Sequence, residues 1–266
     1  MIKRFILLFS GICLLALGCG TDDLSDADLS SLGLSDQIRA YIFESFQEDG
    51  TRHLNLYFET IEEYNCTNFE LEVESQIQGN RIQINILGLK LPSGELCKEG
   101  ISKAAKVVDL GNLTAESYDL DLTLLGELHE SGSLDLSSLY LDLNFPTEGW
   151  MQVDNNRTTI IPSNTVWGYY LSESGHYDDF AKDFIDGLEG FGTPLENNGF
   201  FGSFSVDNGQ VKIIKNEGNR TDQFTGFGIR YEGEISVLEE WVFENYCTLN
   251  GELGLYSTQG EFFPCN

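Results

Sequence analysis

The stretch FELEVESQIQGNRIQINI, residues 69–86, decides the fold of the N-terminal half of the chain. Apolar residues alternate with glutamates in Phe69–Val73 and with polar residues in Ile82–Ile86, so each segment has one apolar and one polar face at the period of a β-strand. Gly79-Asn80 lies between the two segments and is typical of a two-residue hairpin turn. The stretch therefore predicts two antiparallel strands that bury one face.

The same alternation recurs on both sides of this hairpin, in short segments separated by turn residues. The segments with this pattern are residues 38–46, 53–59, 118–124, 134–136 and 139–143. The first of them is also compatible with a short helix. Six or more short strands of this kind predict an antiparallel β-sandwich over residues 37–145.

One segment of this half carries a family resemblance. Val108–Leu120 places a small polar turn before Tyr118, which begins a predicted strand. This arrangement resembles the late strands of immunoglobulin-like domains in bacterial surface proteins. The resemblance implies an Ig-like sandwich for the N-terminal domain and carries no activity.

The pattern changes after a stretch that contains Pro146, Gly149 and the run Asp154-Asn155-Asn156. These turn-forming residues predict a linker over residues 146–158 and a second domain over 159–266. Strands are predicted there at 165–171, 200–206, 210–214, 224–231 and 253–257, and helices at 178–188 and 236–246. The last of these helices could instead be a strand. The order of elements predicts a small α+β domain, ferredoxin-like in outline.

Residues 1–18 have the pattern of an export signal. Lys3-Arg4 precedes the apolar run Phe5–Leu17, which is too short to span a bilayer as a mature helix. Gly18 then directly precedes Cys19. The combination resembles the bacterial lipoprotein signal, which is cleaved before a cysteine that carries lipid, and it implies lipidation of Cys19. The alternative is an ordinary signal peptide in which Cys19 is incidental.

Residues 19–36 follow as a predicted flexible tether, with four aspartates in Asp22–Asp28. An acidic cluster behind the lipidated cysteine resembles the surface-export signal of Bacteroidota lipoproteins. The resemblance implies an outer-membrane location, with the protein anchored by lipid and exposed at the cell surface. A solvated acidic tether also explains the charges, and the two explanations are compatible.

The charge of the chain limits its partners. The sequence contains 15 lysines and arginines against 43 aspartates and glutamates, which gives a formal net charge of −28. Such a chain repels nucleic acid phosphates and anionic lipid headgroups, so we expect no nucleic acid partner and contact with the membrane only through the lipid anchor. A cationic partner, a divalent ion or a neutral ligand stays open.

Four cysteines remain beyond the signal and the lipidation site, namely Cys66, Cys97, Cys247 and Cys265. An even number of cysteines in an exported chain predicts two disulfides. Three pairings are possible, and Cys66–Cys97 with Cys247–Cys265 fits the domain division. Neither these cysteines nor the three scattered histidines have the spacing of a metal site, and we expect no cofactor.

Calcium is the one ion that the sequence leaves open. Asp119 and Asp121 lie on one face of a predicted strand, and Asp207-Asn208-Gly209 is an oxygen-rich turn. Neither matches the twelve-residue calcium loop. Carboxylates on a solvated strand face and ordinary turn chemistry explain both features better.

Three aromatic residues of the second domain, Trp167, Tyr169 and Tyr177, are the candidate ligand-binding residues, together with Trp150 near the linker. They could form a platform for a sugar or a peptide, although aromatic residues in a small domain more often belong to the core. The cleft between the two domains is the default ligand site.

The sequence contains no nucleophile elbow of the form Gly-x-Ser-x-Gly and no His-Glu-x-x-His motif. We therefore expect a non-catalytic binding or accessory module of the cell envelope, with a glycan, a peptide or a protein as its partner. Two alternatives are an envelope hydrolase that uses acidic residues and a structural component of an outer-membrane assembly.

Overall fold

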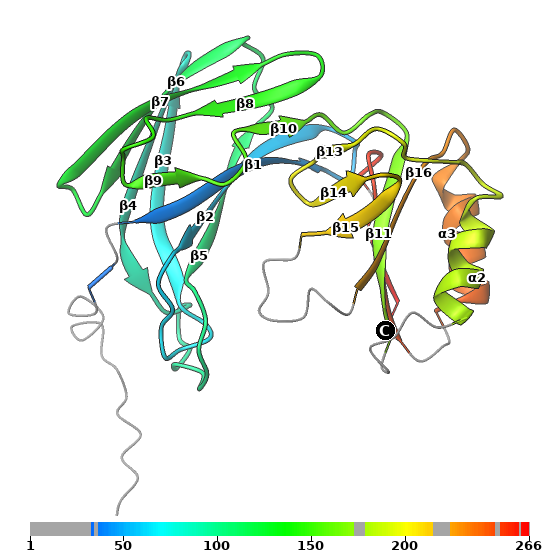
Figure 1. Ribbon diagram of the computed structural model, residues 1–266. Coiled ribbons are helices and arrows are strands. Elements are labelled where there is room, and N and C mark those ends of the chain that lie inside the picture. The colour runs from blue at the N-terminus through cyan, green and yellow to red at the C-terminus, as the bar shows by residue number, and fades with distance from the viewer. Residues whose placement is uncertain are drawn as a thin grey trace, which may run out of the picture.

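The computed structural model describes residues 33–34, 37–172, 179–214, 224–247, 251–260 and 262–265. The predicted signal, Cys19 and most of the predicted tether lie outside these residues. The chain folds into two units that lie side by side, an N-terminal unit of residues 37–159 and a C-terminal unit of residues 165–265 (Figure 1). Strands make up most of the N-terminal unit, as the alternating sequence pattern predicted, and the C-terminal unit combines strands with helices.

The N-terminal unit is one hydrogen-bonded sheet of ten strands. The strands are β1 (Ile38–Phe46), β2 (Arg52–Thr60), β3 (Glu70–Gln78), β4 (Arg81–Lys90), β5 (Ala105–Gly111), β6 (Ser117–Leu124), β7 (Leu128–Leu136), β8 (Tyr140–Asn144), β9 (Met151–Val153) and β10 (Arg157–Thr159). Their order across the sheet is β10-β8-β7-β6-β4-β3-β5-β2-β1-β9. Alternate residues of these strands are buried in a single core, because successive side chains of a strand point to opposite faces.

The hairpin predicted at Gly79-Asn80 joins β3 to β4, and Gln78 pairs with Arg81 across it. Gly79 has a φ of 60°, a conformation that glycine adopts without the strain that a Cβ would cause. The sheet is not wholly antiparallel as predicted, since β4 and β6 run parallel over six residue pairs. Alternation within a strand carries no information about the direction of its neighbour, so the sequence did not reveal this pair.

Two short strands lie where the sequence predicted a linker, at residues 146–158. β9 pairs in parallel with β1, and β10 pairs antiparallel with β8. These two strands therefore extend the sheet at both of its edges, β9 beside β1 and β10 beside β8. Each is only three residues long, too short for an alternating pattern to be recognised among the turn-forming residues that surround it.

In its described residues, the C-terminal unit is an eight-stranded sheet with two helices. Its elements are β11 (Thr165–Ser172), α2 (Asp179–Leu188), β12 (Thr193–Pro194), β13 (Gly199–Phe200), β14 (Phe204–Asp207), β15 (Gln210–Ile213), β16 (Phe224–Arg230), α3 (Ile235–Asn245), β17 (Gly251–Ser257) and β18 (Phe262–Cys265). The strand order is β13-β14-β15-β16-β11-β17-β18, with β12 beside β16. The segment 236–246, for which the sequence left helix or strand open, is helical.

Each face of this second sheet has a core of its own. Both helices cover one face, where Phe184 of α2 and Leu238 of α3 pack against side chains of β11, β16 and β17. The helices lie on the side away from the N-terminal unit (Figure 1). The opposite face carries a second cluster that includes Trp167, Phe204 and Phe46, and Phe46 belongs to β1 of the N-terminal unit. The two units thus share a hydrophobic core.

Candidate functional site

A cavity of about 460 Å³ lies between the two units. We call it the inter-unit cavity. β1 supplies its wall on the N-terminal side, and β11, β17 and the residues beside β14 and β15 supply the other wall. Aromatic rings from both units line it, namely Phe43, Phe46, Trp167, Tyr169 and Tyr256. Its volume lies in the range of small-molecule sites, and its lining is mostly apolar, as such sites usually are.

Trp167, one of these lining residues, is only 4% exposed. Its ring stacks on Tyr256 at 5.8 Å between centroids with an interplanar angle of 15°, and it packs against Phe204 at 5.5 Å. Its indole nitrogen Nε1 has no hydrogen-bond partner among the described residues. A buried N–H group without a partner is unfavourable by about 1–3 kcal/mol, so a ligand that supplies an acceptor for this group would bind more tightly.

Tyr169 lies two residues further along β11 and therefore on the same face of the sheet. Its hydroxyl donates a hydrogen bond of 2.5 Å to Glu252 Oε1. Tyr170 belongs to the core beneath the helices, on the other face. Trp167 and Tyr169 thus lie together at the inter-unit cavity, and both side chains are almost fully buried.

A buried carboxylate, Glu44 of β1, lies at the edge of the cavity. Its Oε1 forms an ion pair with Arg52 Nε at 2.9 Å, and its Oε2 accepts a hydrogen bond of 2.6 Å from the backbone N–H of Ile161. Burial raises the pKa of Glu44, while Arg52 and the Ile161 N–H act in the opposite direction. Glu44 therefore ties the end of β1 to the chain that enters the C-terminal unit.

Two further contacts join the units around the cavity, and a third holds β1 within the N-terminal unit. Gly260 lies so close to the Gln47 carbonyl that a side chain at this position would clash with it. Gly202 packs in the same way against Phe43 of β1, with a φ of 85°. The Thr158 hydroxyl donates to the Ile42 carbonyl at 2.8 Å. The walls of the cavity are therefore held by backbone contacts as well as by side chains.

The other predicted site residues are distributed as follows. Cys19 and Tyr177 lie outside the described residues. Cys66 and Cys97 form the predicted disulfide, with 5.4 Å between their Cα atoms. Cys247 is also disulfide-bonded, and the side chain of Cys265 lies outside the described part of the structure.

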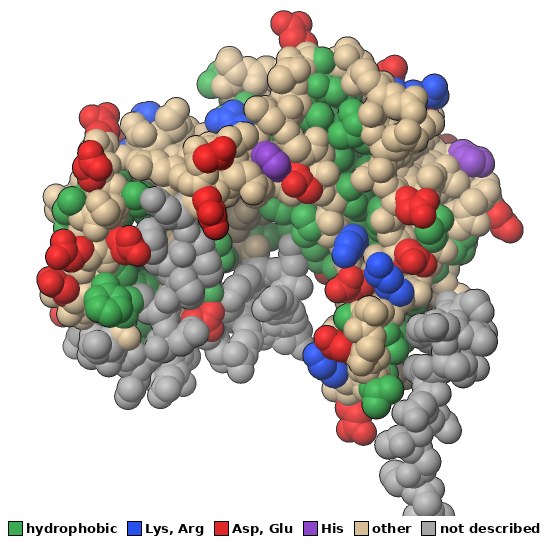
Figure 2. All heavy atoms as spheres, turned by 180° about the vertical axis from the view of Figure 1, so that it is seen from behind, with side chains coloured by type: hydrophobic (Ala, Val, Ile, Leu, Met, Phe, Trp, Pro, Cys, Tyr) green, Lys and Arg blue, Asp and Glu red, His purple; other side chains and the backbone are tan. Residues whose placement is uncertain are grey.

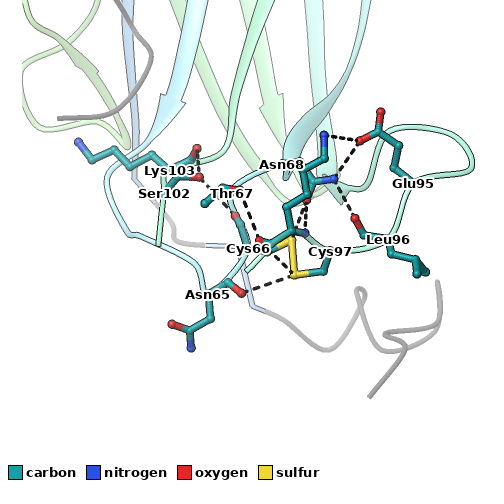
Figure 3. The surroundings of a disulfide bond; sticks show 10 residues. Asn65, Cys66, Thr67, Asn68, Glu95, Leu96, Cys97, Ser102 and Lys103 are labelled. Atoms are coloured by element: carbon teal, nitrogen blue, oxygen red, sulfur yellow. Dashed lines mark hydrogen bonds and ion pairs between the residues drawn. A yellow bond between two sulfur atoms is a disulfide. The ribbon is translucent and has the colours of Figure 1, made fainter. Parts of the chain in front are cut away.

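The Cys66–Cys97 disulfide lies in a loop region at one end of the first sheet, where Asn68 organises the surrounding backbone (Figure 3). The Asn68 side chain accepts a hydrogen bond from the Lys98 N–H and donates one to the Leu96 carbonyl. The disulfide thus closes a loop that side-chain hydrogen bonds already order, which is a structural role.

The calcium candidates do not gather into an ion site. Asp121 forms an ion pair with Arg81 and accepts a hydrogen bond of 3.0 Å from the Ser131 hydroxyl. Asp207 flanks the two-residue turn Asn208-Gly209, in which both residues have positive φ. Among the residues that the structure describes, no group of three or more His, Cys, Asp or Glu side chains could hold a metal ion.

Sequence reasoning missed Glu44, although a signal was present. Ile38, Ala40 and Ile42 mark the inward-facing positions of β1, and Glu44 continues the same phase. A charged residue in phase with core positions must find a partner inside the protein, because burial of an unpaired charge is very unfavourable. An in-phase carboxylate was therefore a stronger indication of a special site than the many acidic residues on the polar faces.

Comparison with known protein families, with curated proteins and with solved structures finds no match to this chain. Within the described residues, no helix is both long and apolar enough to cross a membrane.

Proposed function

We propose that this protein is a non-catalytic binding module whose ligand occupies the inter-unit cavity. The single observation that carries the proposal is the buried N–H of Trp167, a residue that lines an aromatic cavity between the two units, and this N–H has no partner among the described residues. A cavity of about 460 Å³ suits a small molecule, a sugar unit or one large side chain of a peptide.

The lining favours a neutral group that accepts a hydrogen bond. Ser45, Ser203 and Ser257 add hydroxyls to the aromatic walls. The carboxylate of Glu44 is neutralised by Arg52 and so offers no free charge to a ligand. A glycan hydroxyl or a peptide carbonyl would meet these requirements, and the aromatic edges would cover the apolar face of either.

The lining gives less support to an acidic hydrolase. Hydrolysis of a glycosidic bond by that route needs two carboxylates that flank the bond. Among the described residues that line the inter-unit cavity, the one carboxylate is Glu44, whose Oε1 is in the ion pair with Arg52 and whose Oε2 accepts from the Ile161 N–H. A hydrolase would therefore have to break the contact that joins β1 to Ile161 before it could act.

The anchor and the location belong to the same proposal. The signal and Cys19 favour a protein anchored by lipid in the outer membrane and exposed at the cell surface. The many acidic side chains on the face drawn in Figure 2, with few lysines and arginines, agree with a partner that is not a nucleic acid. A structural role in an outer-membrane assembly is the alternative, and it predicts stable co-purification with a larger envelope complex.

The fold of each unit is also proposed at a finer level. The order β15-β16-β11-β17, with α2 and α3 covering one face, supports a ferredoxin-like centre for the C-terminal unit, extended by β12, β13, β14 and β18. For the N-terminal unit an Ig-like relationship rests on the sequence resemblance alone.

The binding proposal is tested by a screen of envelope glycans and peptides for ligands that raise the melting temperature. Two variants probe the cavity: Trp167→Phe removes the N–H and keeps a ring, and Ser203→Phe fills the space. Trp241→Phe, on the helix-covered face, is the matched control. We expect any cavity ligand to bind at least tenfold more weakly to the first two variants and equally to the control. Equal binding by all three variants would exclude the cavity as the site.

Lipidation is tested separately, by intact mass and membrane fractionation of the wild type beside Cys19→Ser. Lipid mass on the wild type and loss of the variant from the membrane support the anchor. A wild-type protein without lipid contradicts it.

A further inference from the structure

A second hollow lies at the opposite end of β1 from the inter-unit cavity. It has a volume of about 750 Å³ and opens broadly to the surface. We call it the Trp150 groove, and its main lining residues are His129, Glu130, Pro146, Glu148 and Trp150. At about 3.4 Å per residue along β1, it lies roughly 20–30 Å from the inter-unit cavity, so the two hollows are separate.

Glu130 of β7 is the residue that makes this groove unusual. It is only 8% exposed, and it lies in phase with the buried Leu134 of its strand. Its Oε2 accepts a hydrogen bond of 3.0 Å from the Met151 N–H, while its Oε1 has no partner among the described residues. A buried carboxylate oxygen without a partner is strongly unfavourable unless a donor satisfies it.

Gly149 makes room for this carboxylate. A Cβ at position 149 would overlap both oxygens of Glu130, so no other residue type fits there without displacing Glu130. The backbone at this point is fixed in turn, because the Trp150 carbonyl accepts a hydrogen bond of 3.2 Å from the Ile38 N–H. The carboxylate is thus held in place by the junction between β1 and β9.

Trp150 offers the complementary group. Its indole Nε1 is buried and has no hydrogen-bond partner among the described residues. The residues that line the groove therefore include one unsatisfied acceptor, Glu130 Oε1, and one unsatisfied donor, Trp150 Nε1, and both atoms are buried just beneath the lining. A ligand that satisfies both must present a donor and an acceptor.

The charges at the groove favour a positively charged donor. Glu148 is a second carboxylate of the lining, and no lysine or arginine lies among the described lining residues. His129 has its Nδ1 within 3.2 Å of the Thr123 hydroxyl. A hydrogen bond between a carboxylate and an ammonium group is about twice as strong as one between neutral groups.

We propose that the Trp150 groove binds a primary ammonium group that has a carbonyl oxygen beside it, as the amino terminus of a peptide does. The ammonium donates to Glu130 Oε1, and the first carbonyl accepts from Trp150 Nε1. Capture of a peptide terminus by a few fixed polar groups is a known mode of recognition. This proposal does not depend on the function proposed for the inter-unit cavity.

Three small probes test the chemistry on the full chain by NMR titration. Glycinamide carries both groups, N-acetylglycinamide lacks the ammonium, and ethylamine lacks the carbonyl. We expect glycinamide to bind at least tenfold more tightly than N-acetylglycinamide and severalfold more tightly than ethylamine. Equal binding of glycinamide and its acetylated form, or no binding of glycinamide at millimolar concentrations, would overturn the proposal.

Two variants test the residues. Glu130→Gln keeps an acceptor for the Met151 N–H and removes the charge, so glycinamide binding should fall at least tenfold. Trp150→Phe should remove the preference for glycinamide over ethylamine while leaving ethylamine binding unchanged. Glu116→Gln, an exposed glutamate outside the groove, is the matched control. If Glu130→Gln does not fold, Trp150→Phe still decides, because an unchanged preference in that variant contradicts the assignment.

Discussion

Replacement of Arg52 by alanine would leave the buried carboxylate of Glu44 without its counter-ion. At 2.9 Å and an effective dielectric constant of about 20, the two charges attract by roughly 6 kcal/mol, which is an upper bound. The Arg52 side chain is 40% exposed, so water screens part of this attraction. Removal of one partner of a buried pair typically destabilises by about 3–5 kcal/mol. We therefore expect Arg52→Ala to lower the free energy of unfolding by about 3 kcal/mol.

The matched control is Arg157→Ala, because Arg157 also pairs with a carboxylate, Asp142, but lies on the surface with 59% of its side chain exposed. Surface pairs contribute about 0.2–1 kcal/mol. For a chain of this size about 3 kcal/mol corresponds to a fall of roughly 6–12 °C in melting temperature, against a few degrees for the control. Thermal unfolding at pH 7 measures both, and an equal effect of the two substitutions would refute the reasoning.

The pH dependence of this effect provides a second check. The pKa of Glu44 is raised in the folded state, so protonation of Glu44 favours folding. The corresponding stability is present below the unfolded pKa of about 4.5 and is lost as the pH rises through the folded value. Arg52 opposes this rise, so the difference between wild type and Arg52→Ala should grow with increasing pH and shrink in acid. A difference that is constant from pH 4 to pH 8 would mean that Glu44 is not the group involved.

Three further predictions concern other parts of the structure. Gly202→Ala should lower the free energy of unfolding by about 2 kcal/mol or more, because the added methyl group would clash with β1. Gly209→Ala places its methyl group in open space and should lower it by only about 1 kcal/mol, the strain of a positive φ, so equal losses in urea unfolding would contradict the clash. Replacement of both Cys66 and Cys97 by serine should lower the free energy of unfolding by about 4 kcal/mol, because the disulfide closes a loop of 31 residues. An unchanged melting temperature would contradict the loop-closure account. Arg81 of β4 lowers the pKa of Asp121, so Asp121 contributes stability that is lost as the pH falls through its folded-state pKa. Asp121→Asn should therefore make the free energy of unfolding less dependent on pH in acid, and an unchanged dependence would contradict the ion pair.

The sequence predicted the strands and helices whose pattern is long enough to repeat. The strand pair of residues 69–86, the helices α2 and α3 and the hairpin at Asn208-Gly209 all follow from alternation, helical spacing and turn residues. The parallel pairing of β4 with β6 and the strands β9 and β10 could not be predicted, because they depend on neighbours that are distant in sequence.

The candidate sites were predictable to a smaller extent. Trp167 and Tyr169 were named as ligand residues, and the structure brings both to the cavity between the units. Glu44 and Glu130 were not named, because many acidic residues of this chain made each one uninformative by itself. Their phase distinguishes them from the rest: both occupy inward-facing positions of strands whose other inward residues are mostly apolar. Partners such as the Ile161 N–H come from distant segments and are visible only after folding.

The position of β9 and β10 at the two edges of the first sheet also sets an order of assembly. The ribosome synthesises the chain from its N-terminus, so β1 is complete long before Met151 of β9, which pairs with Ile38 of β1. In the same way, β8 is complete before its partner strand β10. Until β9 and β10 are made, both edges of the sheet have unpaired backbone groups, which can pair with other chains or bind chaperones. A fragment that stops at residue 145 keeps those edges open permanently and should aggregate. One that extends past Thr159 includes both edge strands, so the proper end of the first folding unit lies after β10.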